Sequence, residues 1–180
     1  SVIDSLSPEL ILAAGWYYMI PRLIREIPKY GAWGFHASLL PKYAGGAPLV
    51  WAIIKGETET GITLFRMESG VDDGDIIAQK KININANDTI KSLIRKVTNQ
   101  SKKILKYVLT KSEITFIPQD KNKLEVYPQR SPSDGKIDWS LDNKKIKDFI
   151  RAQTKPYPGA WTIINGYKVT IWDAEIEKLK

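Results

Sequence analysis

The chain has 180 residues, of which 43% are hydrophobic, so it is long enough to bury one sizeable core. It has no cysteine and one histidine, which excludes disulfides and thiolate chemistry and argues against a metal site. The net charge of +7 favours an anionic partner such as a nucleotide, a polyglutamate tail or RNA, although the lysines are spread as on an ordinary solvated surface. The sequence shows no membrane-spanning apolar run and no signal-peptide pattern, which together predict a cytoplasmic protein without a membrane partner.

The first elements along the chain predict a β-α-β unit. Residues 10–14 form a continuous apolar run, typical of a strand buried on both faces of a parallel sheet. An aromatic cluster follows at residues 16–20, and a proline then begins a predicted helix over residues 22–29. The next apolar run, residues 32–35, ends at His36. Because ligands of open α/β sheets bind outside the carboxyl ends of the strands, we expect the aromatic cluster and His36 to share one rim.

A helix, two strands and an acidic loop follow. The apolar segment 47–54 predicts a buried helix. Residues 60–66 and 76–84 are typical of strands, and an antiparallel ribbon is the simplest interpretation. Between them, the glycine-bounded loop 70–75 carries three aspartates. Loops held in this way by flanking strands often carry function.

The second half of the chain predicts two helices and a hairpin. The longest helix covers about residues 89–109, with the Asn-Asp pair at 87–88 as its N-cap signal and with one apolar and one lysine-rich face. Proline and glycine mark a connector at residues 128–135, and a short amphipathic helix follows at about 142–153. An Asn-Gly pair at 165–166 between two β-rich runs predicts a two-residue hairpin turn.

The order of these elements predicts an α/β protein. A partial sheet with flanking helices occupies residues 1–127, and a linker with a small subdomain of one helix and one β-hairpin occupies residues 128–180. The sequence has no dinucleotide fingerprint, P-loop, zinc spacing or nucleophile-elbow motif. Dinucleotide, kinase-like and α/β-hydrolase functions therefore have no support.

His36 and a carboxylate of the acidic loop are the parts of a proton-transfer pair. Imidazole titrates near neutral pH, and an adjacent carboxylate fixes its tautomer and favours its protonated form. Such a pair suits attack of an amine on a carbonyl, where the imidazolium stabilises the oxyanion and the carboxylate takes the amine's proton. From the residues alone, however, a hydrogen-bonded core histidine beside a turn capped by aspartates is the favoured interpretation.

Four segments in order carry a resemblance that reverses this preference. They are residues 35–43 (FHASLLPKY), 46–53 (GAPLVWAI), 57–63 (ETETGIT) and 70–76 (GVDDGDI), and they resemble the folate-dependent formyltransferase family. That family includes glycinamide ribonucleotide, methionyl-tRNA and amino-sugar formyltransferases. Parts of residues 130–161 resemble the segment that follows the catalytic domain in the methionyl-tRNA and amino-sugar branches. The resemblance covers nearly the whole chain and implies a partial Rossmann-like formyltransferase sheet.

The resemblance also implies a reaction and the residues that perform it. The family transfers a formyl group from 10-formyltetrahydrofolate to a primary amine, and the matching catalytic residues are His36 and Asp72. Two further segments match positions whose backbones hold the pterin in the family. These implied cofactor-binding residues are Tyr18, Met19, Ile20, Gly70, Val71, Asp73 and Gly74.

Three features depart from the family. Gly34 occupies the position of the family asparagine that would hydrogen-bond the formyl oxygen. Losing one such hydrogen-bond donor typically lowers the reaction rate by ~10²–10³-fold. The arginine of the family's Tyr-Arg-Gly falls on Ala44. The chain also starts at what resembles a late strand of the family sheet, so we expect a missing half, a homodimer that covers the exposed edge, or impaired activity.

We therefore expect a formyltransferase acting on a small amine, an amino group of a nucleotide-linked sugar. The short tail after the hairpin leaves little room for the larger RNA-binding barrel of a methionyl-tRNA enzyme. Methionyl-tRNA is the alternative acceptor, and the charge of +7 supports it. Gly34 and the missing strands motivate a second alternative, an inactive relative that binds folate or serves as an assembly partner. A basic RNA-binding module is the third alternative.

Overall fold

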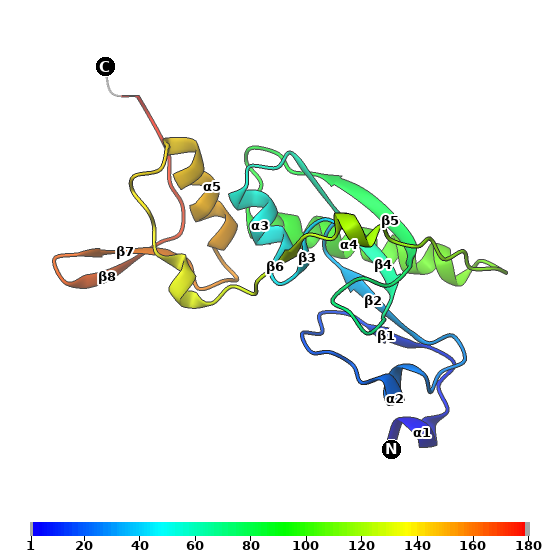
Figure 1. Ribbon diagram of the computed structural model, residues 1–180. Coiled ribbons are helices and arrows are strands. Elements are labelled where there is room, and N and C mark those ends of the chain that lie inside the picture. Colours follow the sequence, from blue (N-terminus) through cyan, green and yellow to red (C-terminus); the bar gives the residue numbers. More distant parts are fainter. Residues whose placement is uncertain (1, 179–180) are drawn as a thin grey trace.

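The computed structural model describes residues 2–178 and shows a four-stranded sheet with its covering helices, followed by a helix and a β-hairpin (Figure 1). The helices are α1 (Val2–Leu6), α2 (Arg22–Arg25), α3 (Pro48–Ile54), α4 (Ile90–Leu109) and α5 (Asn143–Gln153), with short 3₁₀ turns η1 (Lys121–Lys123) and η2 (Pro132–Gly135). The strands are β1 (Ile11–Ala13), β2 (Ala32–His36), β3 (Ala44–Gly45), β4 (Glu59–Arg66), β5 (Ile76–Asn83), β6 (Val126–Tyr127), β7 (Ala160–Ile164) and β8 (Tyr167–Ile171). The expected α/β class is confirmed.

The main sheet has the order β1-β2-β4-β5. β1 and β2 are parallel, as a β-α-β unit requires, and β4 and β5 form the antiparallel ribbon expected around the acidic loop. β2 is antiparallel to β4, with Trp33 opposite Arg66 and His36 opposite Thr63. The loop after β4 therefore starts beside the beginning of β2, and it must turn back over the sheet to reach the end of that strand.

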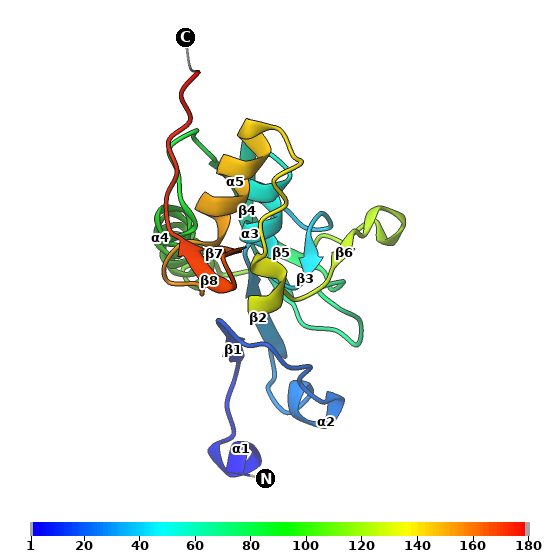
Figure 2. The ribbon, with the colours of Figure 1, turned by 90° about the vertical axis from the view of Figure 1, so that its left-hand side faces the viewer.

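The two faces of the sheet bury different clusters. Leu64 and Trp33 belong to the larger core, which α3 and α4 complete with residues such as Leu93. The neighbouring residue on β4, Phe65, points to the other face and packs with Leu40 in a smaller cluster. Figure 2 shows α4 and the β3–β6 pair on opposite sides of the sheet. Within residues 2–178, no helix is long and apolar enough to cross a bilayer.

β1 is shorter and more exposed than expected. Leu12 at its centre is 38% exposed, because β1 is the edge strand of this sheet within residues 2–178. The prediction of a strand buried on both faces was therefore wrong for these residues. The helix predicted over residues 22–29 is also shorter and ends at Arg25, since the residue before Pro28 is biased away from helical backbone.

The N-cap of α4 is Thr89 and not the Asn-Asp pair that precedes it. Thr89 Oγ1 accepts a hydrogen bond from the Ser92 N–H, and Ser92 Oγ accepts one from the Thr89 N–H at 3.0 Å. Asp88 is buried and accepts from the Asn85 N–H and from Ser92 Oγ, each at 2.7 Å, and pairs with Lys96. Burial opposes the ionisation of Asp88, but these hydrogen bonds outweigh it and hold its pKa below the usual value.

We predict that Asp88→Asn lowers the free energy of unfolding by about 2 kcal/mol at pH 7, the range for hydrogen bonds to a charged group. The folded-state pKa of Asp88 is depressed, so its stabilisation is complete above the unfolded pKa of about 3.9 and is lost as pH falls through the lower folded value. Urea unfolding at pH 7 and at pH 3 should show the difference between the two proteins shrinking on acidification. Glu113→Gln, the same charge change at an exposed site, is the control.

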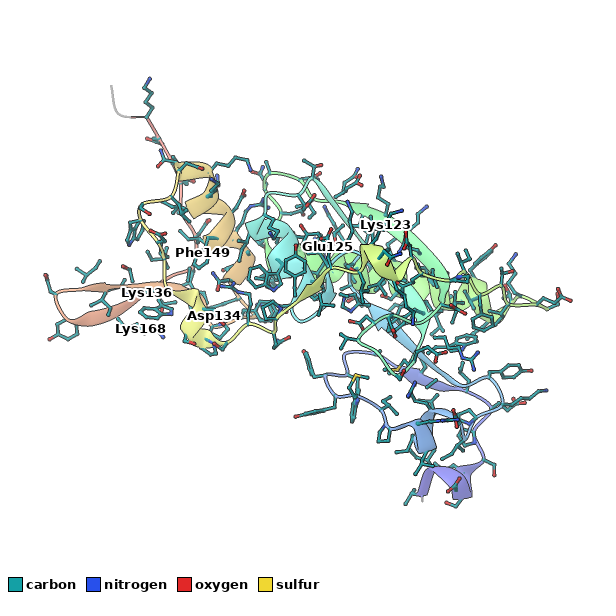
Figure 3. All side chains as sticks on the ribbon, viewed as in Figure 1. Lys123, Glu125, Asp134, Lys136, Phe149 and Lys168 are labelled. Carbon is teal, nitrogen blue, oxygen red and sulfur yellow. The ribbon has the colours of Figure 1, made fainter. Side chains whose placement is uncertain are left out.

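The C-terminal helix and hairpin pack on the main body through α5. Asp142 Oδ1 accepts from the Lys145 N–H at 2.9 Å and begins α5, which packs against α3. In Figure 3, Phe149 lies on α5 and Lys168 lies on the hairpin. The hairpin turn has positive φ values at Asn165 (49°) and Gly166 (82°), which confirms the predicted two-residue turn.

Candidate active site

His36 ends β2 and is buried, with 8% of its surface exposed. Its Nε2 lies 2.7 Å from the carbonyl oxygen of Tyr43. A carbonyl only accepts, so Nε2 carries a proton and donates it. Nδ1 is then the nitrogen that faces the rest of the site.

Two hydrogen bonds to neighbouring parts of the chain hold the loop that supplies this carbonyl. Thr63 Oγ1 donates to the Ser38 carbonyl at 2.7 Å, and the Tyr43 hydroxyl donates to Glu57 Oε1 at 2.7 Å. Burial, followed by the adjacent Glu57 carboxylate, raises the pKa of the Tyr43 phenol well above its usual value. Tyr43 therefore stays neutral and anchored at both ends, which fixes the acceptor of His36.

Asp72 meets His36 from the acidic loop. Its Oδ2 lies 3.2 Å from His36 Nδ1 and accepts a hydrogen bond from the Gly45 N–H at 2.8 Å. Because Nε2 already carries a proton, the contact between Nδ1 and a carboxylate oxygen would set two lone pairs against each other unless a proton lies between them. The pair must hold this proton on one partner or the other.

The pair lies at the wall of a cavity of about 340 Å³. The aromatic cluster and His36 line it together, as expected from their places at the rim. Of the residues matched to the pterin site, five line the cavity. They are Tyr18, Met19, Ile20, Gly70 and Val71.

Asp73 and Gly74 do not line this cavity. Asp73 turns away, and its Oδ2 pairs with Lys121 Nζ at 3.0 Å. Gly74 packs so closely on the start of the loop that a Cβ there would lie 1.8 Å from the Arg66 carbonyl oxygen. These two residues shape the loop, and their place as pterin-holding positions stays a prediction.

The two positions at which a residue of the family pattern is replaced, Gly34 and Ala44, lie in well-packed surroundings. A Cβ at Gly34 would lie 3.0 Å from Phe65 Cε1 and 3.3 Å from Met67 Cγ, so neighbouring side chains occupy the space in which a side chain at residue 34 would begin. Ala44 is fully buried in β3, opposite Val126. Neither position supplies a side-chain donor to the cavity.

We predict that Gly34→Ala lowers the free energy of unfolding by about 1–3 kcal/mol, because the Phe65 ring must give way to the new methyl group. The check is a double-mutant cycle with Phe65→Leu, measured by urea unfolding. Gly34→Ala should lower the free energy of unfolding by a smaller amount in the Phe65→Leu background than in the unchanged chain. Equal costs in both backgrounds would show that the ring does not limit residue 34.

Sequence reasoning missed Gln129 as a residue of the cavity wall. β3 and β6 pair in parallel, and this pairing places the connector that follows β6, residues 128–135, beside the site. At Gly46, a Cβ would lie only 2.3 Å from Gln129 Cα, so this glycine permits the close approach of the two segments. The Gly45-Gly46 pair was the signal in the sequence, although it does not identify the partner segment.

An α/β sheet that carries a buried histidine beside a half-buried aspartate at a cavity wall is an arrangement suited to proton transfer on a small ligand. Two family models identify the class further. The model described as formyl transferase matches residues 1–109, and the model described as formyl transferase, C-terminal domain, matches residues 130–180. The chain belongs to the formyl transferase family, and the resemblance seen in the sequence is confirmed.

Individual relatives agree with this assignment. A methionyl-tRNA formyltransferase of Alkaliphilus oremlandii is 37% identical over 177 residues, which are 97% of this chain and 57% of that protein. The chain thus spans little more than half of this relative's length. A methionyl-tRNA formyltransferase from Clostridium thermocellum superimposes with a TM-score of 0.84 at 26% identity, over 97% of this chain and 75% of that one. WlaRD, a sugar 3N-formyl transferase solved in the presence of dTDP and 5-N-formyl-THF, superimposes with a TM-score of 0.73 at 25% identity. The match covers 94% of this chain and 63% of WlaRD.

Proposed function

We propose that this chain carries the catalytic centre of a formyltransferase that uses 10-formyltetrahydrofolate and a primary amine, with His36 and Asp72 as the catalytic residues. The observation that carries the proposal is the 3.2 Å contact between His36 Nδ1 and Asp72 Oδ2 at the wall of a cavity of about 340 Å³. Family membership supplies the class of reaction, and this contact supplies the two residues that can move a proton.

The cavity suits a flat, partly apolar donor. Its volume is near the lower end of the ~300–1,000 Å³ usual for ligand sites. Met19, Ile20 and Phe65 give it apolar walls, and the glycine-bounded loop at Gly70 and Val71 offers backbone groups. The presence of 5-N-formyl-THF in the WlaRD structure supports the same class of donor here. When bound, 10-formyltetrahydrofolate would supply the formyl carbon.

Asp72 and His36 would manage the protons of the transfer. Asp72 Oδ1 has no hydrogen-bond partner within residues 2–178, so it can accept a proton from the attacking amine. With the proton of the pair on His36 Nδ1, the ring would carry a positive charge and would stabilise negative charge on the formyl oxygen, while Asp72 would stay free to act as the base. The pair would then return a proton to the donor nitrogen that loses the formyl group.

The acceptor that we propose is the amino group of a nucleotide-linked sugar. WlaRD, a sugar formyltransferase solved with dTDP, supports this choice. Methionyl-tRNA is the second candidate, because the relative of Alkaliphilus oremlandii is a methionyl-tRNA formyltransferase and the chain has a net charge of +7. An inactive folate-binding relative is a third candidate, favoured by the absence of a side-chain donor at Gly34.

A direct assay separates these candidates. The chain is supplied with 10-formyltetrahydrofolate and with amino-sugar nucleotides or methionyl-tRNA in parallel, and formylated product is measured. We expect product from at least one amino-sugar nucleotide. Product from methionyl-tRNA alone would overturn the proposed acceptor. Tight folate binding without product from any acceptor would favour the inactive relative.

A further inference from the structure

Gln119 reaches across 47 residues of sequence to the loop that carries Asp72. Its Nε2 donates to the carbonyl oxygen of Asp72 at 2.8 Å and to that of Gly74 at 2.6 Å. Both partners are carbonyls, which only accept, so chemistry fixes the orientation of the amide. Two hydrogen bonds from one side chain therefore hold the backbone on both sides of Asp73.

The segment around Gln119 is itself fastened to the same region. Ile117 pairs with Ile76, the first residue after the loop, through two backbone hydrogen bonds of 2.8 Å. Two residues beyond Gln119, Lys121 Nζ pairs with Asp73 Oδ2 at 3.0 Å. Residues 117–121 thus contact the end of the loop, its middle and its main-chain carbonyls.

The backbone of Asp72 needs such support. Its φ is +51°, in the left-handed region that residues with a side chain adopt only at a cost in free energy. This conformation aims the carboxylate at His36, with Oδ2 3.2 Å from Nδ1. If the loop relaxed to a negative φ at Asp72, the carboxylate would point elsewhere.

The position of Gln119 leaves one of its polar atoms in an unfavourable environment. Its Oε1 is buried and has no hydrogen-bond partner within residues 2–178. An unpaired buried oxygen destabilises the fold, and the amide cannot turn over without losing both bonds to the loop. Stability alone does not explain an amide in this place, whereas the geometry of Asp72 does.

We propose that Gln119 is a positioning residue for the catalytic pair, which holds Asp72 in its left-handed conformation and so keeps the carboxylate against His36. The catalytic consequence rests on the proposed function, but the positioning itself does not. Gln119 acts on the carbonyls of the loop, and it does not line the cavity. Its loss should therefore change turnover more than substrate binding.

The test uses Gln119→Met, which keeps the length of the side chain and removes both donors. Gln119→Asn, which keeps the amide but shortens its reach by one methylene group, replaces it if the methionine variant does not fold. Gln100→Met is the matched control, because Gln100 is a half-buried glutamine on α4 without a side-chain hydrogen bond in the described residues. Asp72→Asn serves as the reference for a broken pair.

The first readout is the imidazole NMR spectrum of His36, which is free of overlap because the chain has one histidine. We expect the ring ¹H and ¹⁵N signals of Gln119→Met to move toward those of Asp72→Asn, while Gln100→Met keeps the original positions. Signals of Gln119→Met that coincide with those of the unchanged protein would overturn the proposal. This comparison needs no substrate, so it decides the positioning role even if every acceptor fails and the proposed function is lost.

The second readout is kinetic. With an acceptor that is turned over, kcat of Gln119→Met should fall by about tenfold to 10²-fold, the usual consequence of misplacing a catalytic group, with little change in the acceptor KM. A purely structural role predicts lower thermal stability with unchanged kcat in the folded fraction. That outcome would overturn the catalytic part of the proposal.

Discussion

Asp72→Asn should lower kcat for formyl transfer by about 10²–10⁴-fold, the range that a positioned proton-transfer group contributes. The asparagine fits the same space and can still accept the Gly45 N–H, which lies 2.8 Å from Asp72 Oδ2. It cannot take up a proton from an amine, and it no longer shares one with His36 Nδ1. Initial rates at saturating donor and acceptor, measured for both proteins, provide the comparison.

Asp75→Asn is the matched control for this prediction. Asp75 belongs to the same loop, and the substitution removes the same charge, but its side chain does not line the cavity. Turnover by Asp75→Asn should stay close to that of the unchanged chain. The assignment of Asp72 as a catalytic residue is wrong if the two variants lose activity equally, or if neither does.

Arg151→Leu should lower the free energy of unfolding by about 3 kcal/mol or more, as the loss of one partner from a buried ion pair does. Arg151 is 8% exposed; its Nε donates to Asp148 Oδ1 at 2.7 Å, and its Nη1 donates to the Asp88 carbonyl at 2.6 Å. Removing it leaves Asp148, which is 5% exposed, with Lys144 as its remaining partner. Urea unfolding monitored by tryptophan fluorescence measures the loss.

An exposed arginine in an ion pair of the same length is the control. Arg22 Nε lies 2.7 Å from Glu26 Oε1, but the two side chains are 79% and 60% exposed. Surface pairs of this kind contribute about 0–1 kcal/mol, so Arg22→Leu should have a small effect. Similar losses from the two substitutions would show that the link between α5 and the start of α4 does not stabilise the fold.

Local patterns predicted the elements that depend on nearby residues. The Asn-Gly turn at 165–166 has the positive φ values that its sequence favours, and β4 and β5 pair as a ribbon around the acidic loop. The family pattern, rather than spacing, singled out His36 and Asp72 among the titratable residues. The structure then brings the two together, although the strand order alone would leave the loop beside the opposite end of β2.

The contacts that sequence reasoning missed depend on distant partners. Gln119 lies 47 residues beyond Asp72, and no local rule links a glutamine after a proline to carbonyls of an earlier loop. Phe65 fills the space beside Gly34 because antiparallel pairing sets the two residues opposite each other, a register that the sequence does not state. The prediction that β1 is buried on both faces was wrong for a related reason, because hydrophobicity does not reveal which neighbouring element covers a strand.

The path of the connector between β6 and α5 affects where two chains of this family can be divided and recombined. Gln129 lies just before the second region matched by a family model, yet it forms part of the cavity wall beside His36, and the preceding Pro128 carbonyl accepts from Trp51 Nε1 at 2.9 Å. The C-terminal portion is thus not an independent module. A chimera that exchanged everything after β6 between two relatives would therefore also exchange Gln129, so the shape of the cavity would follow the source of that portion as well as the source of the sheet.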